Sequence, residues 1–333
     1  MGTVFNHNRT YGVELEVNTS YGANTLADAI NAELTPRGIS AQCQVQSYNH
    51  RASSSWKIVS DATVRGWEVV SPILKGLEGK EEIDAVCAAL RSLNVTTGVQ
   101  TGMHVHHDAR GLTAKQIGGT FGAYAAFQTL LNYGVSRSRR GREQGGYNTI
   151  ANWNRITSNG SDNYNRNYTY GITAVTTFRG PRADNASAFI SSINRKIGMA
   201  RECSISIGSS LSRHGTIEFR QHQGTTNATK VWTWVLITQS IIERQVQNRV
   251  SFPKPVYVEI ANGKSVAKGD FIRFKRFIAI SPRYNGGDTA TTEPYVWAFK
   301  QLYKNIKKFA RQDGITDTKD IGKNQSNHNY VRP

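Results

Sequence analysis

Four short segments alternate charged or imidazole-bearing residues with apolar ones, and this alternation constrains the fold of the chain more than any other feature. The segments are residues 11–17, 66–72, 102–107 and 215–222. Because successive side chains of a β-strand point to opposite faces, each segment predicts a strand with one polar and one apolar face. The polar residues that would share a face are Glu14 with Glu16, His104 with His106, and Glu218 with Arg220 and His222.

The segments around these strands complete an α+β pattern. Hydrophobic residues at helical spacing predict helices that begin near Asn24 and Asn227, each of which is an expected N-cap. A curved, mainly antiparallel sheet with helices packed on one face accounts for the pattern. Further expected helices cover residues 81–93, 113–133, 190–200 and 295–310. Further expected strands cover residues 41–46, 56–60 and 204–207. The last of these strands is expected to form a hairpin with residues 216–222 through residues 213–215.

The chain divides into a main domain and a C-terminal extension. We expect a domain over residues 1–250, with a basic insertion rich in Asn and Tyr at about 136–180. A C-terminal extension with a basic helix follows at 251–333. The insertion interleaves basic and aromatic residues, which suits either a solvated loop or single-stranded nucleic acid.

The net charge of the chain indicates which class of partner it attracts. The 333 residues carry a formal net charge of +17, which favours nucleic acid or another polyanion as a partner. Much of the excess lies in residues 137–142 and 300–311, outside the four strands. No segment approaches the ~20 apolar residues of a membrane span, and three widely spaced cysteines suggest buried thiols in a reducing compartment. We therefore expect a cytoplasmic protein, and the sequence leaves its oligomeric state open.

The polar face of the predicted sheet offers metal ligands. Clustered carboxylates are hard oxygen ligands that suit Mg²⁺ or Mn²⁺. Some of these glutamates can instead be ordinary surface or ion-paired residues, but without a metal their charges would repel one another strongly. The candidate metal ligands are Glu14, Glu16, Glu68 and Glu218.

Four further side chains extend the candidate site. His104 and His106 can bind a metal, contact phosphate or serve as hydrogen-bonded structural histidines. Arg220 can bind phosphate or a carboxylate, or form an ion pair with a neighbouring glutamate. Asp61 can help hold a metal, orient an amine or cap a turn. The sequence contains neither a Walker A loop nor a Rossmann glycine motif, so any bound nucleotide needs metals to hold its phosphates.

Taken together and in this order, these segments resemble the amidoligase family. The resemblance rests on Gly-Val-Glu-Leu-Glu at 12–16, Trp-Lys-Ile-Val-Ser-Asp at 56–61, the strand at 66–74, Gly-Met-His-Val-His at 102–106 and the segment 215–225 with the tryptophan-bearing helix after it. It covers roughly residues 10 to 245. Amidoligases belong to the carboxylate–amine ligase superfamily, together with glutamine synthetase and glutamate–cysteine ligase.

The resemblance implies a glutamine synthetase-like catalytic sheet that holds ATP and Mg²⁺. The expected reaction forms an amide through an acyl phosphate, which an amine then attacks. Glu14, Glu16, Glu68 and Glu218 would be the metal ligands, and His104 and His106 would contact metal or nucleotide phosphate. The residues with catalytic roles would be Arg220, which also contacts phosphate, Asp61 and Glu218.

The substrates that the resemblance implies are a carboxylate and an amine on a peptide, a protein or a cell-envelope polymer, and the basic surface favours an acidic one. Two other functions stay open. The first is a non-catalytic virion or polyanion-binding protein on the same fold, which the net charge of +17 and the basic run at residues 137–142 favour. The second is a metal-dependent hydrolase that uses His104 and His106.

Overall fold

The computed structural model describes residues 3–49, 51–61, 64–139, 204–206, 208–247, 260–261, 264–265, 270–278 and 293–312. The chain forms two compact units. Unit 1 comprises Met1–Phe5, Ala109–Ile217 and Leu236–Pro333, and unit 2 comprises Asn6–Asp108 and Glu218–Val235.

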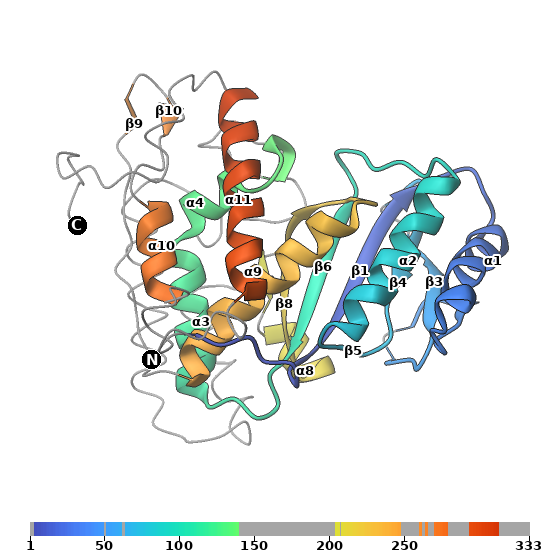
Figure 1. Cartoon of the computed structure of the whole chain (residues 1–333), viewed down its shortest axis with the longest axis horizontal. Helices are drawn as coiled ribbons and strands as arrows, with labels where there is room; N and C mark the ends of the chain where they lie inside the picture. The colour runs from blue at the N-terminus through green and yellow to red at the C-terminus, as the bar shows by residue number, and fades with distance from the viewer. Residues whose placement is uncertain are drawn as a thin grey trace. The chain divides into compact units, whose positions relative to one another are not determined.

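Unit 2 is built on an open, mixed sheet (Figure 1). Its strands follow the order β2-β3-β4-β1-β6-β8, and β5 pairs with β1. The pairs of β1 with β4, β5 and β6, and of β3 with β4, are antiparallel, whereas β2 runs parallel to β3. The strands are β1 (Thr10–Asn18), β2 (Cys43–Val45), β3 (Trp56–Ser60), β4 (Gly66–Val70), β5 (Leu74–Lys75), β6 (Gly102–Asp108) and β8 (Thr216–Gln223), of which β8 begins in unit 1.

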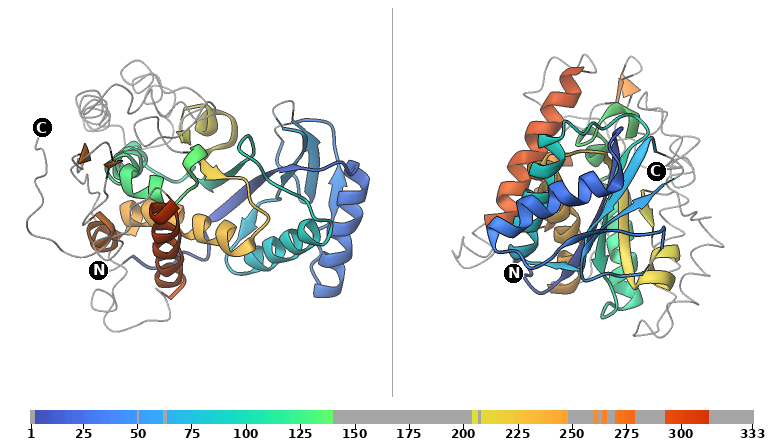
Figure 2. Two further views of the ribbon diagram at one scale, coloured as in Figure 1. Left: turned by 90° about the horizontal axis from the view of Figure 1, so that it is seen from above. Right: turned by 90° about the vertical axis from the view of Figure 1, so that its right-hand side faces the viewer.

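Helices cover the apolar face of this sheet. Helices α1 (Ala23–Leu34) and α2 (Glu78–Ser92) lie on the same side of the strands (Figure 2), and η1 (Thr35–Arg37) extends α1. The first turns of α9 (Ala228–Gln247) belong to the same unit, and Trp232 of this helix packs against Tyr11 of β1. The structure thus confirms the predicted α+β class with a mainly antiparallel sheet.

Unit 1 is mainly helical over the described residues. Its elements are α3 (Ala114–Ala126), α4 (Gln128–Tyr133), η2 (Arg137–Arg139), β7 (Ile205–Ser206), α8 (Gly208–His214), the rest of α9, β9 (Ile260–Ala261), β10 (Lys264–Ser265), α10 (Asp270–Ile278) and α11 (Glu293–Gln312). Aromatic rings link these helices. Phe274 of α10 lies between Phe127 and Phe299, with ring centroids 4.9 and 5.2 Å away.

Three local predictions were wrong. The helix expected at 113–133 is two helices that meet at Phe127, whose backbone (φ −104°, ψ 9°) departs from helical geometry. Strand β7 does neighbour β8, but α8 connects them where a tight turn was expected. Helix α1 begins after Gly22, so Asn24 lies inside the first turn and does not cap the helix. By contrast, Asn227 caps α9 as predicted, because its Oδ1 accepts the Lys230 N–H at 3.1 Å.

Some predictions lie beyond the described residues. These are the helix at 190–200 and, apart from residues 136–139, the insertion at 136–180. The domain limits at residue 250 stay a prediction. Among the described residues, no helix is long and apolar enough to cross a membrane.

Candidate functional site

The register of three strands places five of the predicted site residues on one face of unit 2. Glu14 of β1 lies directly opposite His104 of β6, and Glu16 of β1 lies opposite Glu68 of β4. Residues paired in this way across antiparallel strands point to the same face of the sheet. His106 lies opposite Gly12. The sheet therefore gathers carboxylates and imidazoles from three strands on one face. Together with Glu218 and Arg220 of β8, these side chains form what we call the floor of unit 2.

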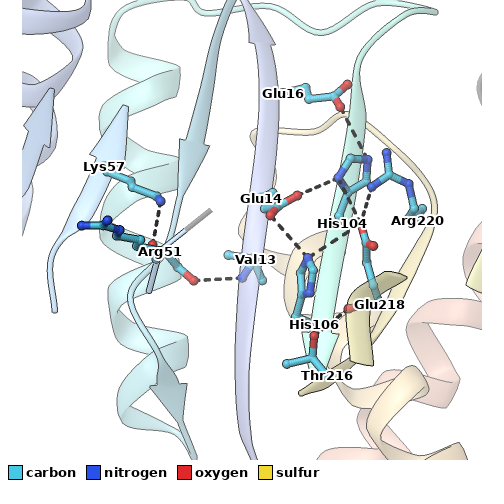
Figure 3. Close-up of polar contacts among 12 residues, drawn as sticks. Val13, Glu14, Glu16, Arg51, Lys57, His104, His106, Thr216, Glu218 and Arg220 are labelled. Atoms are coloured by element: carbon cyan, nitrogen blue, oxygen red, sulfur yellow. Dashed lines mark hydrogen bonds and ion pairs between the residues drawn. The ribbon is translucent and has the colours of Figure 1, made fainter. Parts of the chain in front are cut away.

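His104 is the central residue of this floor. Its Nδ1 is 2.9 Å from Glu14 Oε2 and 3.8 Å from Glu218 Oε1, and its Nε2 is 3.5 Å from Glu16 Oε1 (Figure 3). Only 3% of its side chain is exposed. A buried imidazole within reach of carboxylates from two other strands is held in position from several sides.

A second set of contacts lies beside the first. His106 Nε2 is 3.3 Å from Glu14 Oε1 and 3.7 Å from Glu218 Oε1. Arg220 donates a charge-assisted hydrogen bond through Nη1 to the same Glu218 oxygen. Glu218 thus contacts both histidines and the guanidinium, and the ion pair considered from the sequence is present.

Burial and neighbouring charges push the pKa values of these groups in different directions. Burial alone would raise the pKa of the Glu14 carboxyl, but His106 and His104 hold it well below its usual range. Burial likewise opposes ionisation of Glu218, and His106 and Arg220 nevertheless lower its pKa. The pKa of His106 is raised because Glu14 and Glu218 outweigh its burial. The negative charges of Glu14 and Glu218 are therefore offset by the positive charges of His106 and Arg220.

Glu68 differs from the other glutamates. Burial first, and then the carboxylates of Glu14, Glu16 and Asp61, raise its pKa to about 9 despite the opposing effect of Arg220. The side chain is 7% exposed. The contribution of Asp61, which lies just after β3, is part of this shift, and its role in the site stays a prediction. A divalent cation would offset both causes, because its charge favours the ionised form of the Glu68 carboxyl.

The donor atoms of the floor fit a metal ion. Two groups each bring three donor atoms within 4.8 Å of one another, namely Glu14, His104 and Glu218, and Glu16, Glu68 and His104. Each group offers two carboxylates and the shared His104, and carboxylate oxygen suits Mg²⁺ and Mn²⁺ while imidazole also suits Mn²⁺. All four predicted glutamates therefore lie in potential metal-binding groups, and their ligation stays a prediction.

Two histidines of the same strands do not join the floor. His107 is buried on the apolar face, 6.3 Å from the Tyr11 ring and 5.9 Å from the Phe219 ring. Its pKa is well below the usual range because of burial and the nearby charge of Arg9. His222 was expected to share a face with Glu218, but its buried ring lies 5.4 Å from Trp234 of α9.

Lys57 is a residue that the sequence analysis did not select. It pairs across β3 and β4 with Val70, which in turn pairs with Glu14, so all three point to the polar face. Its Nζ donates to the Arg51 carbonyl at 2.9 Å and to the Asn49 carbonyl and Oδ1 at 3.1 and 3.2 Å. The alternation of β3 contains the signal, because Lys57 and Val59 share a face, but the surrounding apolar run conceals it.

A second contact that could not be read from the sequence fixes Glu16. The backbone N–H of Gly102 donates to Glu16 Oε2 at 2.5 Å. This bond leaves Oε1 of the same carboxylate directed at His104, 3.5 Å away. The backbone of β6 therefore orients one carboxylate of the second donor group.

Comparison with known proteins identifies the family of the chain. A family model described as "putative amidoligase enzyme" matches residues 7–242, and no curated protein matches the chain. The matched range contains every strand of the floor and each of its carboxylates, imidazoles and the guanidinium. Because the match covers more than half of the sequence, the chain belongs to the amidoligase family.

Proposed function

We propose that the protein is an ATP- and Mg²⁺-dependent carboxylate–amine ligase, with Mn²⁺ as an alternative ion. The observation that carries the proposal is the pair of donor groups that share His104 on the floor of unit 2. Two adjacent cation positions lined by glutamate suit the β- and γ-phosphates of a nucleotide. The family name supports a ligase, and the donor chemistry supports the choice of cofactors.

The reaction would proceed in two balanced steps. A substrate carboxylate oxygen attacks the γ-phosphorus of ATP, so that ADP leaves and an acyl phosphate forms. An amine nitrogen then attacks the acyl carbon, phosphate leaves, and the amine loses a proton. The bound metal would neutralise phosphate charge, as it does in other phosphoryl transfers.

The residues of the chain have distinct parts in this scheme. Glu14, Glu16, Glu68 and Glu218 would hold the metal, with His104 in contact with both groups. Arg220 is a permanent cation beside Glu218 and would stabilise charge on the transferred phosphoryl group. His106 would contact nucleotide phosphate, and Asp61 would orient the incoming amine. A peptide, protein or envelope polymer is the proposed class of substrate.

Calorimetric titration of Mg²⁺-ATP into the full chain tests this function. We expect binding to the wild type and at least about a 100-fold loss in the Glu14→Gln/Glu218→Gln variant, because both substitutions remove ligands of one donor group. A screen of carboxylic acids and amines for ADP release then identifies substrates. Absence of nucleotide binding to either protein would refute the proposed function.

The second candidate is a metal-dependent hydrolase. The observation that favours it is the presence of His104 in both donor groups, since imidazole is a preferred ligand of Zn²⁺. Tight Zn²⁺ binding without any nucleotide binding would support a hydrolase over a ligase. Competition between Zn²⁺ and Mg²⁺-ATP in the same titration separates the two functions.

A further inference from the structure

The two units differ in charge. Unit 2 contains ten Lys and Arg residues and twelve Asp and Glu residues, whereas the ranges of unit 1 contain 31 and 12. The net charge of +17 therefore originates entirely in unit 1. The proposed ligase residues all belong to unit 2, so the reaction does not account for the basic excess.

Helix α11 carries part of this excess on a well-packed scaffold. Its buried side includes Tyr295 and Phe299. The Tyr295 ring packs edge-on against Phe5 at 5.7 Å, and its hydroxyl donates to Gln239 Oε1 at 3.2 Å. The Phe299 ring lies 5.2 Å from Phe274 of α10. These contacts fix the rotation of the helix about its axis and so determine which side chains face solvent.

The opposite side of α11 is a basic stripe formed by Lys300, Lys304, Lys308 and Arg311, all of which are exposed. Residues four or three apart lie above one another on a helix, and these four span about 16 Å at 1.5 Å per residue. Within the part of the chain that the structure describes, none of the four forms an ion pair with a carboxylate. Like charges at this spacing destabilise a helix slightly, so an external counter-charge would relieve them.

The basic stripe also has an aromatic component. Trp297 lies two turns before Lys304 and three turns before Lys308, on the same side of α11, and is partly exposed. Lys307, which directly precedes Lys308, places its Nζ 4.8 Å from the centroid of the Tyr303 ring. Cations that alternate with accessible aromatic rings are typical of surfaces that bind phosphates and stack bases.

We propose that the exposed face of α11, from Trp297 to Arg311, binds single-stranded nucleic acid. The basic stripe neutralises successive phosphates, and Trp297 stacks on a base. The aromatic ring favours this ligand over an acidic polypeptide, whose carboxylates have no π-face to stack. It also favours a single strand over a duplex, in which the bases are already stacked on one another.

The test measures the anisotropy of a fluorescein-labelled oligothymidylate of about 20 nucleotides with the full-length chain, between about 50 and 200 mM salt. Four phosphate contacts predict a slope of log affinity against log salt of about −3. The Lys300→Gln/Lys304→Gln/Lys308→Gln variant should reduce the magnitude of this slope by about 2 and weaken binding at low salt by more than tenfold. Trp297→Leu should weaken binding about tenfold and leave the slope unchanged.

A charge-matched control comes from unit 2. The Arg37→Gln/Lys75→Gln/Lys80→Gln variant removes the same three positive charges from other surfaces. It should bind the oligonucleotide like the wild type, and the stripe variant should bind Mg²⁺-ATP like the wild type. The second result makes the surface proposal independent of the ligase proposal.

Three outcomes would overturn the proposal. An equal loss in both triple variants would mean that net charge, and not the basic stripe, governs binding. Competition by poly-glutamate as strong as that by unlabelled oligonucleotide would assign the surface to acidic polypeptides. A matched duplex that binds as tightly as the single strand, with no effect of Trp297→Leu, would exclude base stacking.

Discussion

The floor of unit 2 and the basic stripe of α11 concentrate charge in opposite ways. On the floor, carboxylates alternate with imidazoles and a guanidinium, and His104, Glu16 and Glu218 are almost fully buried. On α11, exposed lysines follow one another without described acidic partners. The first arrangement suits small ions held at short range, whereas the second suits an extended polyanion.

Exposure to solvent also makes the interaction energies of the charges differ between the two regions. Charges interact several times more strongly at a buried site than in water, where salt also screens them. Substitutions on the floor should therefore change metal binding and stability strongly, and substitutions on α11 should change stability little.

The largest effect is expected at His104. His104→Ala removes the donor shared by both carboxylate groups, so Mn²⁺ affinity should fall by at least about 100-fold. His107→Phe, on the apolar face of the same strand, should keep Mn²⁺ affinity within about threefold, because its ring packs against Tyr11 and Phe219. Calorimetric titration with Mn²⁺ measures both, and an equal loss in the two variants would contradict the assignment of faces.

The second effect depends on pH and concerns Glu68 without metal. Its pKa rises from 4.5 in the unfolded chain to about 9 in the fold, so the folded state binds one more proton between these values. Stability therefore falls as pH rises across this window. Glu68→Gln, which cannot ionise, should be more stable than wild type by several kcal/mol near pH 8. Below pH 4.5 the difference should vanish.

Urea unfolding in the presence of a chelator measures this difference across the pH range. With saturating Mn²⁺ the order should reverse, because the wild type gains the binding free energy of the ion and the variant lacks a ligand. A Glu68→Gln variant that is less stable than wild type at every pH without metal would contradict the raised pKa.

Some features of this site can be predicted from the sequence and others cannot. The period-two alternation predicted the faces of Glu14, His104 and Glu218 because each strand keeps its own periodicity. The pairing of Glu14 with His104, and of Glu16 with Glu68, depends on strand register, which was not predicted from the sequence. The existence of the floor was therefore predictable, and its individual contacts were not.

The remaining differences between the predicted and the observed structure have local causes. The hydrogen bonds of Lys57 could not be predicted from the sequence, because backbone carbonyls accept them and carbonyls have no sequence signature. Helix α8 was missed because Gly208 and several serines favour a turn by propensity, and tertiary context overrides such weak preferences. His222 follows the expected alternation in sequence, yet it packs against Trp234, so proximity along a strand alone did not place it at the floor.

Lys57 gives the third prediction, at the margin of the floor. Lys57→Met leaves the carbonyls of Asn49 and Arg51 without their buried donor and should destabilise the protein by about 1–3 kcal/mol. Lys75→Met, at an exposed position of β5, should change stability by less than about 0.5 kcal/mol. Urea unfolding compares the two, and equal effects would mean that the Lys57 hydrogen bonds contribute nothing.

The smallest effects should have opposite signs in the two units. Lys80 of α2 pairs with Asp84 at 2.5 Å, and because both side chains are about one-third exposed, Lys80→Gln should cost only about 0.3–0.5 kcal/mol. Lys304 of α11 lies between Lys300 and Lys308, so Lys304→Gln removes two like-charge contacts and should stabilise by a similar amount.

Both stability changes arise from electrostatic interactions between exposed charges. About 1 M salt should therefore abolish them, since the Debye length then shrinks to about 3 Å. Paired urea titrations at low and high salt measure the signs. If Lys304→Gln destabilises the protein at low salt, the basic stripe is compensated within the chain. Its charge would then no longer require an external polyanion, and the contrast between the two regions would disappear.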